Sequence, residues 1–224
     1  MRPTRIRDTK MENANDIVSA MPQNSEIRKS ARQMLKGQWT SPVLLTVLFL
    51  LVAVLVGFLQ ETDHIGVTLV YVALSILVLI PFSVGYEIVW LSFLRKGSGE
   101  GVFDDFFSVY KRMGRWIWVY ILRQLFTMLW MLLLIVPGVI KSYSYAMTMF
   151  IAKDNPQMGA NECINRSMVM MAGNKMKLFL LDLSFIGWIL LGILSLGIGM
   201  FWILPYYYSS RAKFYEELKS RAAC

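Results

Sequence analysis

Four ionisable side chains interrupt long apolar stretches of this sequence, namely Glu87, Arg123, Lys141 and Asp182. A charge at the centre of a bilayer costs about 2.5–3.5 kcal/mol even on a lenient insertion scale, so each group should face a partner or water. Charges in such places act in two ways. They hold helices together as compensated pairs, or they line a path for protons or ions.

Depth along the helices indicates which of these charges can meet. Glu87 lies seven residues before the charged end of one apolar run, and Arg123 lies seven residues after the start of the next. Both are therefore about 10 Å deep on the same side, and Asp182 enters its own run from that side about one turn shallower. We predict one ionic cluster of Glu87, Arg123 and Asp182. A packing role is favoured over a proton path, because one compensated group of charges is enough to lock helices together.

Lys141 starts from the opposite surface and heads a separate set of polar residues. Residues three, four and seven positions apart lie on the same face of a helix. This spacing predicts a polar stripe formed by Lys141, Ser144, Tyr145 and Thr148.

The composition predicts an all-α membrane protein. The chain of 224 residues is 56% apolar, and runs of about 20 apolar residues are long enough to cross a bilayer. Helix kinks are expected at Pro81, Pro137 and Pro205, because proline removes a backbone hydrogen bond. We predict a bundle of six transmembrane segments at about 43–59, 67–94, 116–136, 139–152, 178–196 and 198–210.

The positive charges indicate how these segments are oriented. Lys and Arg number 8 in residues 1–41, 5 in 95–115, 4 in 153–177 and 4 in 211–224, which is 21 of 23 in total. Because cytoplasmic loops carry the excess of Lys and Arg, both termini are expected in the cytoplasm with six crossings. The net charge of +8 is explained by this topology, so no nucleic acid partner is predicted. Four crossings remain as an alternative, with the short fourth and sixth segments re-entrant.

The order of the segments suggests a threefold repeat. Residues 25–36, the stretch around 103–112 and residues 156–172 each read as an amphipathic helix before a pair of apolar segments. These helices are expected at the membrane surface, where they would contact anionic lipid headgroups. Chance similarity is the alternative to the repeat, and packing in a protein core is the alternative to the surface position. The predicted domains are a disordered cytoplasmic tail at 1–24, one membrane domain at 25–218 and a C-terminal tail at 219–224.

The sequence contains no set of residues typical of an enzyme or a metal site. His64 is the single histidine, and Cys163 and Cys224 are far apart, so no metal ligands occur at a suitable spacing. No nucleophile motif falls on an apolar segment. We therefore predict no catalytic residue, no metal, no cofactor and no enzymatic activity.

Several motifs in the second half of the chain resemble a known family. It is the bacterial membrane-protein family catalogued as domain of unknown function 975, and the resemblance covers about 26–218. It implies a polytopic protein of the bacterial cytoplasmic membrane and supplies no reaction, ligand or catalytic residue. The motifs are Pro137-Gly138-Val139-Ile140-Lys141-Ser142-Tyr143-Ser144-Tyr145, Asp154-Asn155-Pro156, Leu181-Asp182-Leu183-Ser184-Phe185-Ile186-Gly187-Trp188, Leu196-Gly197-Ile198-Gly199, Pro205-Tyr206 and Phe214-Tyr215-Glu216-Glu217-Leu218.

Two functions remain open at this point. A non-enzymatic scaffold or accessory protein is favoured by the amphipathic helices, which could bind lipid, a protein partner or a second copy of the chain. A small transporter or channel is favoured by the charges and prolines within the apolar segments.

Overall fold

The structure is a computed structural model that describes residues 21–58 and 64–222, and all regular structure in this part is helical. The predicted all-α class is therefore confirmed. Most of the predicted tail at 1–24, and Cys224, lie outside the described residues. The helices are α2 (Asn24–Leu35), α3 (Thr40–Gly57), α4 (Ile65–Leu74), α5 (Ile80–Lys96), α6 (Val102–Phe107), α7 (Met113–Leu133), α8 (Ile135–Ser144), α9 (Thr148–Asp154), α10 (Ala160–Met170), α11 (Lys175–Leu194) and α12 (Met200–Ala222).

Four stretches of the described chain are long and apolar enough to cross a membrane: Thr40–Gly57, Ile65–Lys96, Val102–Leu133 and Lys175–Leu194. They contain most of the predicted first, second, third and fifth segments. The stretch Ile65–Lys96 joins α4 to α5 through a π-helical turn, Ser75–Leu79. Likewise, a 3-10 turn at Ser108–Arg112 joins α6 to α7.

The predicted fourth segment, 139–152, is not one helix. α8 ends at Ser144, the chain turns through residues 145–147, and α9 begins at Thr148. Every residue of α9 from Thr148 to Ala152 is buried, and the helix contacts α5 and α10. Packing in the protein interior thus breaks an apolar run that carries no glycine or proline at the break. As a result, the predicted polar stripe does not form a single helical face.

Most of the predicted sixth segment and the described part of the C-terminal tail form one continuous helix, α12. Hydropathy falls at Arg211, but the helix continues to Ala222 and contacts α2, α3, α5 and α11. Ala212, Phe214 and Leu218 are buried in these contacts. The charged second half of α12 is therefore part of the folded body.

The three prolines have different effects on the helices. Pro81 lies within the continuous helical stretch Ile65–Lys96, just after the π-helical turn, whose altered hydrogen-bond register accommodates the missing N–H. Pro137 lies in the first turn of α8, and this helix begins directly after the extended residue Leu134. Pro137 therefore helps to begin a helix and does not kink one. Pro205 lies inside α12.

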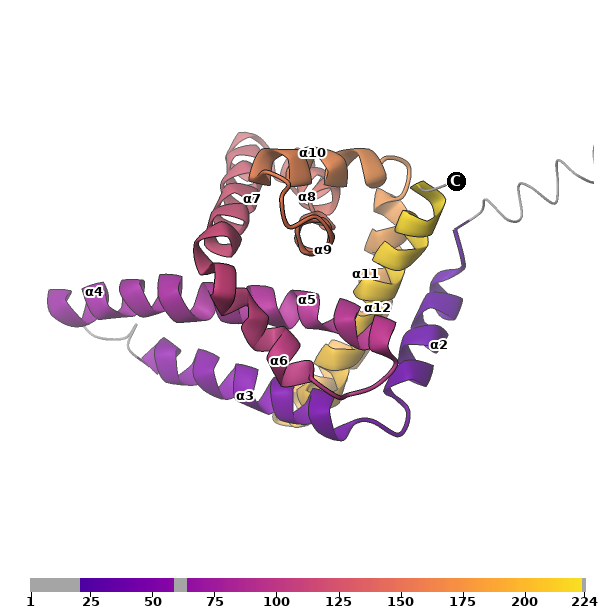
Figure 1. The fold of residues 1–224 in the computed structure, drawn as a ribbon, viewed down its shortest axis with the longest axis horizontal. Helices are drawn as coiled ribbons and strands as arrows, with labels where there is room; N and C mark the ends of the chain where they lie inside the picture. Colours follow the sequence, from indigo (N-terminus) through magenta and orange to yellow (C-terminus); the bar gives the residue numbers. More distant parts are fainter. Residues whose placement is uncertain (1–20, 59–63, 223–224) are drawn as a thin grey trace, which may run out of the picture.

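Helix α5 occupies the centre of the molecule (Figure 1). Tyr86, Trp90 and Phe93 on α5 are among its largest fully buried side chains. α6 packs closely on α5 at Gly85, where an added Cβ would lie 2.8 Å from the Phe106 carbonyl oxygen. Phe106 is therefore a core residue, although Phe103 and Phe107 on the same helix remain exposed.

The first amphipathic helix packs against protein with its apolar face. α2 buries Ile27, Ala31 and Leu35, and it lies beside α12 at the right of Figure 1. α10 likewise buries one side, including Cys163 and Ile164. These apolar faces contribute to the core, so they are not open for insertion into lipid.

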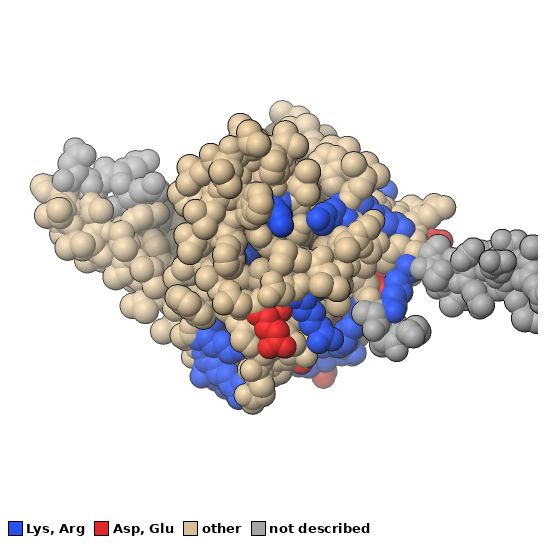
Figure 2. Space-filling view, turned by 90° about the horizontal axis from the view of Figure 1, so that it is seen from above, with Lys and Arg blue, Asp and Glu red and all other residues tan. Residues whose placement is uncertain are grey.

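The helix order follows the predicted repeat of a short helix and a hairpin. α2 precedes α3 and α4–α5, α6 precedes α7 and α8, and α10 precedes α11 and α12. The outer parts of these hairpins expose apolar side chains to the surroundings. None of α4 is buried, and the projecting end formed by α3 and α4 shows no charged side chain in its described part in Figure 2. Together with the four long apolar stretches, this surface indicates association with a membrane.

Candidate functional site

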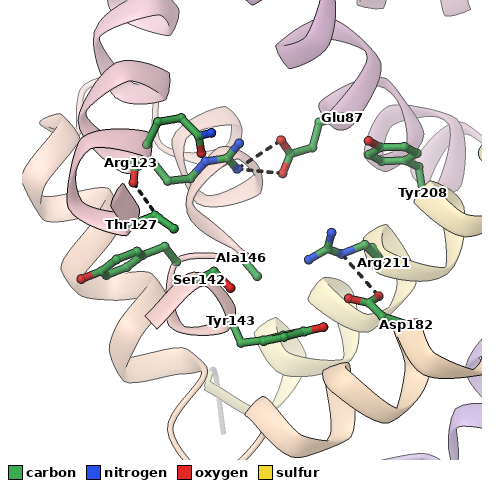
Figure 3. Close-up of a pocket in the computed structure, with 11 residues that line it drawn as sticks. Glu87, Arg123, Thr127, Ser142, Tyr143, Ala146, Asp182, Tyr208 and Arg211 are labelled. Atoms are coloured by element: carbon green, nitrogen blue, oxygen red, sulfur yellow. Dashed lines mark hydrogen bonds and ion pairs between the residues drawn. The ribbon is translucent and has the colours of Figure 1, made fainter. Parts of the chain in front are cut away.

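A polar cavity of about 320 Å³ lies between α5, α7, α8, α11 and α12 (Figure 3). Polar side chains from all five helices gather in this space. It is lined by Glu87, Arg123, Gln124, Thr127, Ser142, Tyr143, Tyr145, Ala146, Asp182, Tyr208 and Arg211.

One wall of the cavity holds an ion pair between α5 and α7. Arg123 Nη1 donates to both carboxylate oxygens of Glu87, at 3.1 and 3.2 Å. The two side chains are 15% and 16% exposed, respectively. The Arg123 guanidinium also lies 5.4 Å from the centre of the Tyr120 ring, which adds a cation–π contact. Glu87 and Arg123 thus join two helices in the protein interior.

The opposite wall holds a looser pair between α11 and α12. Asp182 Oδ1 lies 3.9 Å from Arg211 Nε, which is too long for a hydrogen bond. Arg211 Nη1 donates to the Tyr207 hydroxyl at 3.1 Å. Asp182 Oδ1 is buried and has no hydrogen-bond partner in the described part of the chain. This pair therefore has unused capacity for hydrogen bonds.

The predicted cluster is thus divided into two pairs that face one cavity. Glu87 and Arg123 contact each other directly, and Asp182 pairs with Arg211. Sequence reasoning missed Arg211 because this residue directly follows an apolar segment, where a positive charge is expected as a topology marker. The signal that could have found it is the pattern of α12, in which apolar residues continue at helical spacing beyond Arg211.

The residues of the predicted polar stripe are in separate environments. Lys141 Nζ lies 4.7 Å from the centre of the Trp130 ring, away from the cavity lining. Tyr145 lines the cavity. Ser144 and Thr148 are buried, and their hydroxyls donate to the carbonyl oxygens of Ile140 and Tyr145. The latter two hydroxyls satisfy backbone groups at the break between α8 and α9.

A second charged cluster, the Asp154 network, lies where α5, α9 and α12 meet. Arg95 donates two hydrogen bonds to Asp154, at 2.6 and 2.8 Å. Tyr215 donates a third at 2.9 Å, and Lys219 donates a fourth at 2.6 Å. Arg95 also donates to Glu216 at 2.8 Å. The Asp154 side chain is only 7% exposed, so this carboxylate is the buried centre of the network.

The environment of Asp154 favours its charged form. Burial alone would raise the pKa of this carboxyl, but hydrogen bonds from Arg95, Lys219 and Tyr215 lower the pKa to about 2. The neighbouring Lys153 donates to the carbonyl oxygen of Ile88 at 2.8 Å and to the Ser92 hydroxyl. Burial lowers the pKa of Lys153 to about 8. The network thus brings together two of the motifs, Asp154-Asn155-Pro156 and Phe214-Tyr215-Glu216-Glu217-Leu218, which sequence reasoning had left apart.

The fold and the cavity define an all-helical protein with four stretches of membrane-spanning length and an ion-paired interior. A family model described as "Protein of unknown function (DUF975)" matches residues 21–142 and 131–222, and the chain belongs to this family. No curated protein and no solved structure matches the chain.

Proposed function

We propose that the protein is a multi-pass membrane protein of the bacterial cytoplasmic membrane that acts without catalysis, as a scaffold or accessory protein. The observation that carries this proposal is the pairing of charges between different helices. Glu87–Arg123 links α5 to α7, Asp182–Arg211 links α11 to α12, and Arg95–Asp154 links α5 to α9. Cross-links between helices favour a body of fixed shape, which suits a protein that holds a partner in place.

The partner is tested by purification of the full chain from native membrane in mild detergent, followed by mass spectrometry. A scaffold should retain a defined protein, or a second copy of itself, at constant stoichiometry. An unrelated multi-pass protein that is purified in parallel is the control for non-specific retention. A monomer that retains nothing above this control would contradict the proposal.

The proposed topology has both termini in the cytoplasm and three membrane-inserted hairpins. It is supported by the distribution of Lys and Arg and by the Asp154 network, which gathers charged residues at one end of α5. Two features support re-entrant second and third hairpins. α8 has 10 residues and is thus about 15 Å long, half of a bilayer core. The turns at 133–136 and 194–198 are apolar and exposed.

Cysteine labelling distinguishes six crossings from a topology in which the second and third hairpins are re-entrant and only the first hairpin crosses. Single cysteines are placed at His64, Val136 and Ser195 in a Cys163→Ser, Cys224→Ser background and treated with a membrane-impermeant maleimide from outside the cell. Six crossings predict labelling at all three positions. Re-entrant hairpins predict labelling at position 64 only, since the other two turns would lie within lipid.

A second candidate function, movement of an ion or small solute, is supported by the polar cavity. Its test is proton flux into liposomes, with the parent protein compared with Arg123→Gln. A path that uses this cavity predicts flux in the parent and a changed rate in the variant. Absence of flux in both proteins would exclude a proton path.

A further inference from the structure

The two arginines of the cavity retain donors that their carboxylate partners do not use. Arg123 contacts Glu87 through Nη1 alone, and Arg211 donates one bond to Tyr207. A guanidinium carries five N–H donors in a planar fork that matches a carboxylate or phosphate. In Figure 3 the Arg211 guanidinium points across the cavity toward the side where Arg123 and Glu87 lie. Two such groups facing one space are suited to an oxyanion.

The cavity also offers an acceptor without a donor. Asp182 Oδ1 is buried and makes no hydrogen bond within the described residues, and its distance to Arg211 Nε is 3.9 Å. A buried acceptor without a partner costs about 1–3 kcal/mol, so a bound donor is expected there. An ammonium group supplies a donor and a compensating charge.

The charge balance of the lining selects between ligand classes. Two arginines and two carboxylates line the cavity, so their formal charges cancel. A simple anion or cation would leave a net charge in a poorly solvated space, which is costly. A ligand with one positive and one negative group preserves neutrality. The hydroxyl of Tyr208, which also lines the cavity, can donate to or accept from either group.

We infer that this cavity binds a small zwitterion, whose oxyanion contacts Arg123 and Arg211 and whose ammonium group contacts Asp182. A volume of about 320 Å³ is at the lower end for ligand sites and fits a molecule of this size. The same chemistry, a phosphodiester with one negative charge joined to an ammonium group, occurs in free glycerophosphoethanolamine and in the headgroup of phosphatidylethanolamine. This inference goes beyond the proposed function, because both a scaffold and a transporter could hold such a ligand.

The first experiment measures thermal unfolding of the full chain in detergent with glycerophosphoethanolamine, with inorganic phosphate and with ethanolamine. We expect saturable stabilisation by glycerophosphoethanolamine, and at least tenfold weaker apparent affinity for phosphate or ethanolamine alone, because each of these supplies only one of the two charged groups. Equal affinity for phosphate and glycerophosphoethanolamine would overturn the zwitterion assignment and leave a simple anion site.

The second experiment separates the two sources of the ligand. The protein is reconstituted in nanodiscs that contain equal amounts of phosphatidylethanolamine and phosphatidylglycerol, and retained lipid is identified by native mass spectrometry. Selective retention of phosphatidylethanolamine with no response to glycerophosphoethanolamine assigns the lipid headgroup. A response to glycerophosphoethanolamine without lipid retention assigns a free solute. If neither is bound, the inference is wrong and water fills the cavity.

Variants locate the site. Asp182→Asn removes the acceptor for the ammonium group, and Arg211→Gln removes an oxyanion donor, so each should weaken binding at least tenfold. Lys141→Gln is the matched control, because it removes a positive charge from α8 without altering the cavity lining. Binding that is unchanged in both cavity variants would overturn the inference. If these variants do not fold, the comparison of the whole zwitterion with its halves on the parent chain decides.

Discussion

The cavity and the Asp154 network use the same residue types with different degrees of satisfaction. Asp154 accepts four hydrogen bonds, all of 2.9 Å or less, from Arg95, Tyr215 and Lys219. Asp182 has one arginine at 3.9 Å, and its Oδ1 makes no hydrogen bond within the described residues, although the hydroxyls of Tyr143 and Tyr207 interact with this carboxyl group. A saturated carboxylate can only hold helices together. An unsaturated one beside a cavity has capacity left for a ligand.

The two regions also differ in access to water. In the Asp154 network the cations Arg95 and Lys219 are 38% and 47% exposed, although Asp154 itself is 7% exposed. In the cavity all four charged side chains are between 15% and 22% exposed. Charges in a poorly solvated space interact more strongly, and an unpaired one costs more. We therefore expect the free energy of unfolding to fall when the network loses its carboxylate, and to fall when the charges of the cavity are left unbalanced.

The largest effect is expected for Asp154→Asn. This change removes the anion that Arg95 and Lys219 share, and should lower the free energy of unfolding by about 3 kcal/mol, the lower end of the cost of breaking a buried pair. The measurement is reversible unfolding in mixed micelles. Glu217→Gln is the control, since its pair with Lys213 lies within one helix and should contribute under about 0.5 kcal/mol. Equal effects of the two changes would remove the distinction between network and surface pairs.

Charge balance in the cavity is tested by a double-mutant cycle at Glu87 and Arg123. Arg123→Gln leaves Glu87 without its partner and should cost about 2 kcal/mol, because hydrogen bonds to charged groups contribute in that range. The double variant Glu87→Gln, Arg123→Gln should recover about 1 kcal/mol relative to this single change, since no unpaired charge remains. If the losses from Glu87→Gln and Arg123→Gln simply add in the double variant, the two side chains are not energetically coupled.

Matched tyrosines sharpen the comparison with a smaller change. Tyr215→Phe removes a hydrogen bond of 2.9 Å to Asp154 and should cost about 1 kcal/mol. Tyr208→Phe changes a hydroxyl that lines the cavity and should alter stability by less than about 0.5 kcal/mol, if this hydroxyl serves a ligand. Thermal unfolding without added ligand is the measurement. A larger loss of stability for Tyr208→Phe would show that this hydroxyl stabilises the fold and is not reserved for a ligand.

Sequence reasoning locates most of the helices because long apolar runs determine them. It also brings Glu87 and Arg123 together, since equal depth on adjacent helices is set by the rise per residue. It does not find the break after α8, because residues 145–147 carry no turn signal and the break is imposed by burial of α9. It treats Arg211 as a marker of topology, because its partner Asp182 lies on another helix. Contacts between distant helices decide both features.

The Asp154 network also depends on helix ends that sequence patterns do not relate to one another. Arg95 and Asp154 each follow an apolar stretch, whereas Lys219 lies in the charged C-terminal segment, and in isolation each is a solvated charge beside the membrane. Their meeting requires α12 to continue past Arg211 as a helix, with Lys219 beside the end of α9. The network is therefore a product of tertiary structure, and one sequence alone does not predict it.

The last prediction concerns pH and the two titrating groups at the end of α9, Lys153 and Asp154. The folded-state pKa of Asp154, about 2, is below its ordinary value of 3.8, so its stabilising contribution is complete above about pH 4 and is lost as the pH falls toward 2. The folded-state pKa of Lys153, about 8, is below its ordinary value of 10.5. Its burial is therefore unfavourable below pH 8, and this penalty declines as the pH rises from 8 to 10.5.

Thermal unfolding from pH 3 to 10 should show both slopes in the parent. Asp154→Asn should weaken the acid slope, and Lys153→Met should weaken the alkaline one, because each removes the group that titrates. If Asp154→Asn keeps the full acid slope, other carboxylates control acid stability and the network is less dominant than its hydrogen bonds indicate.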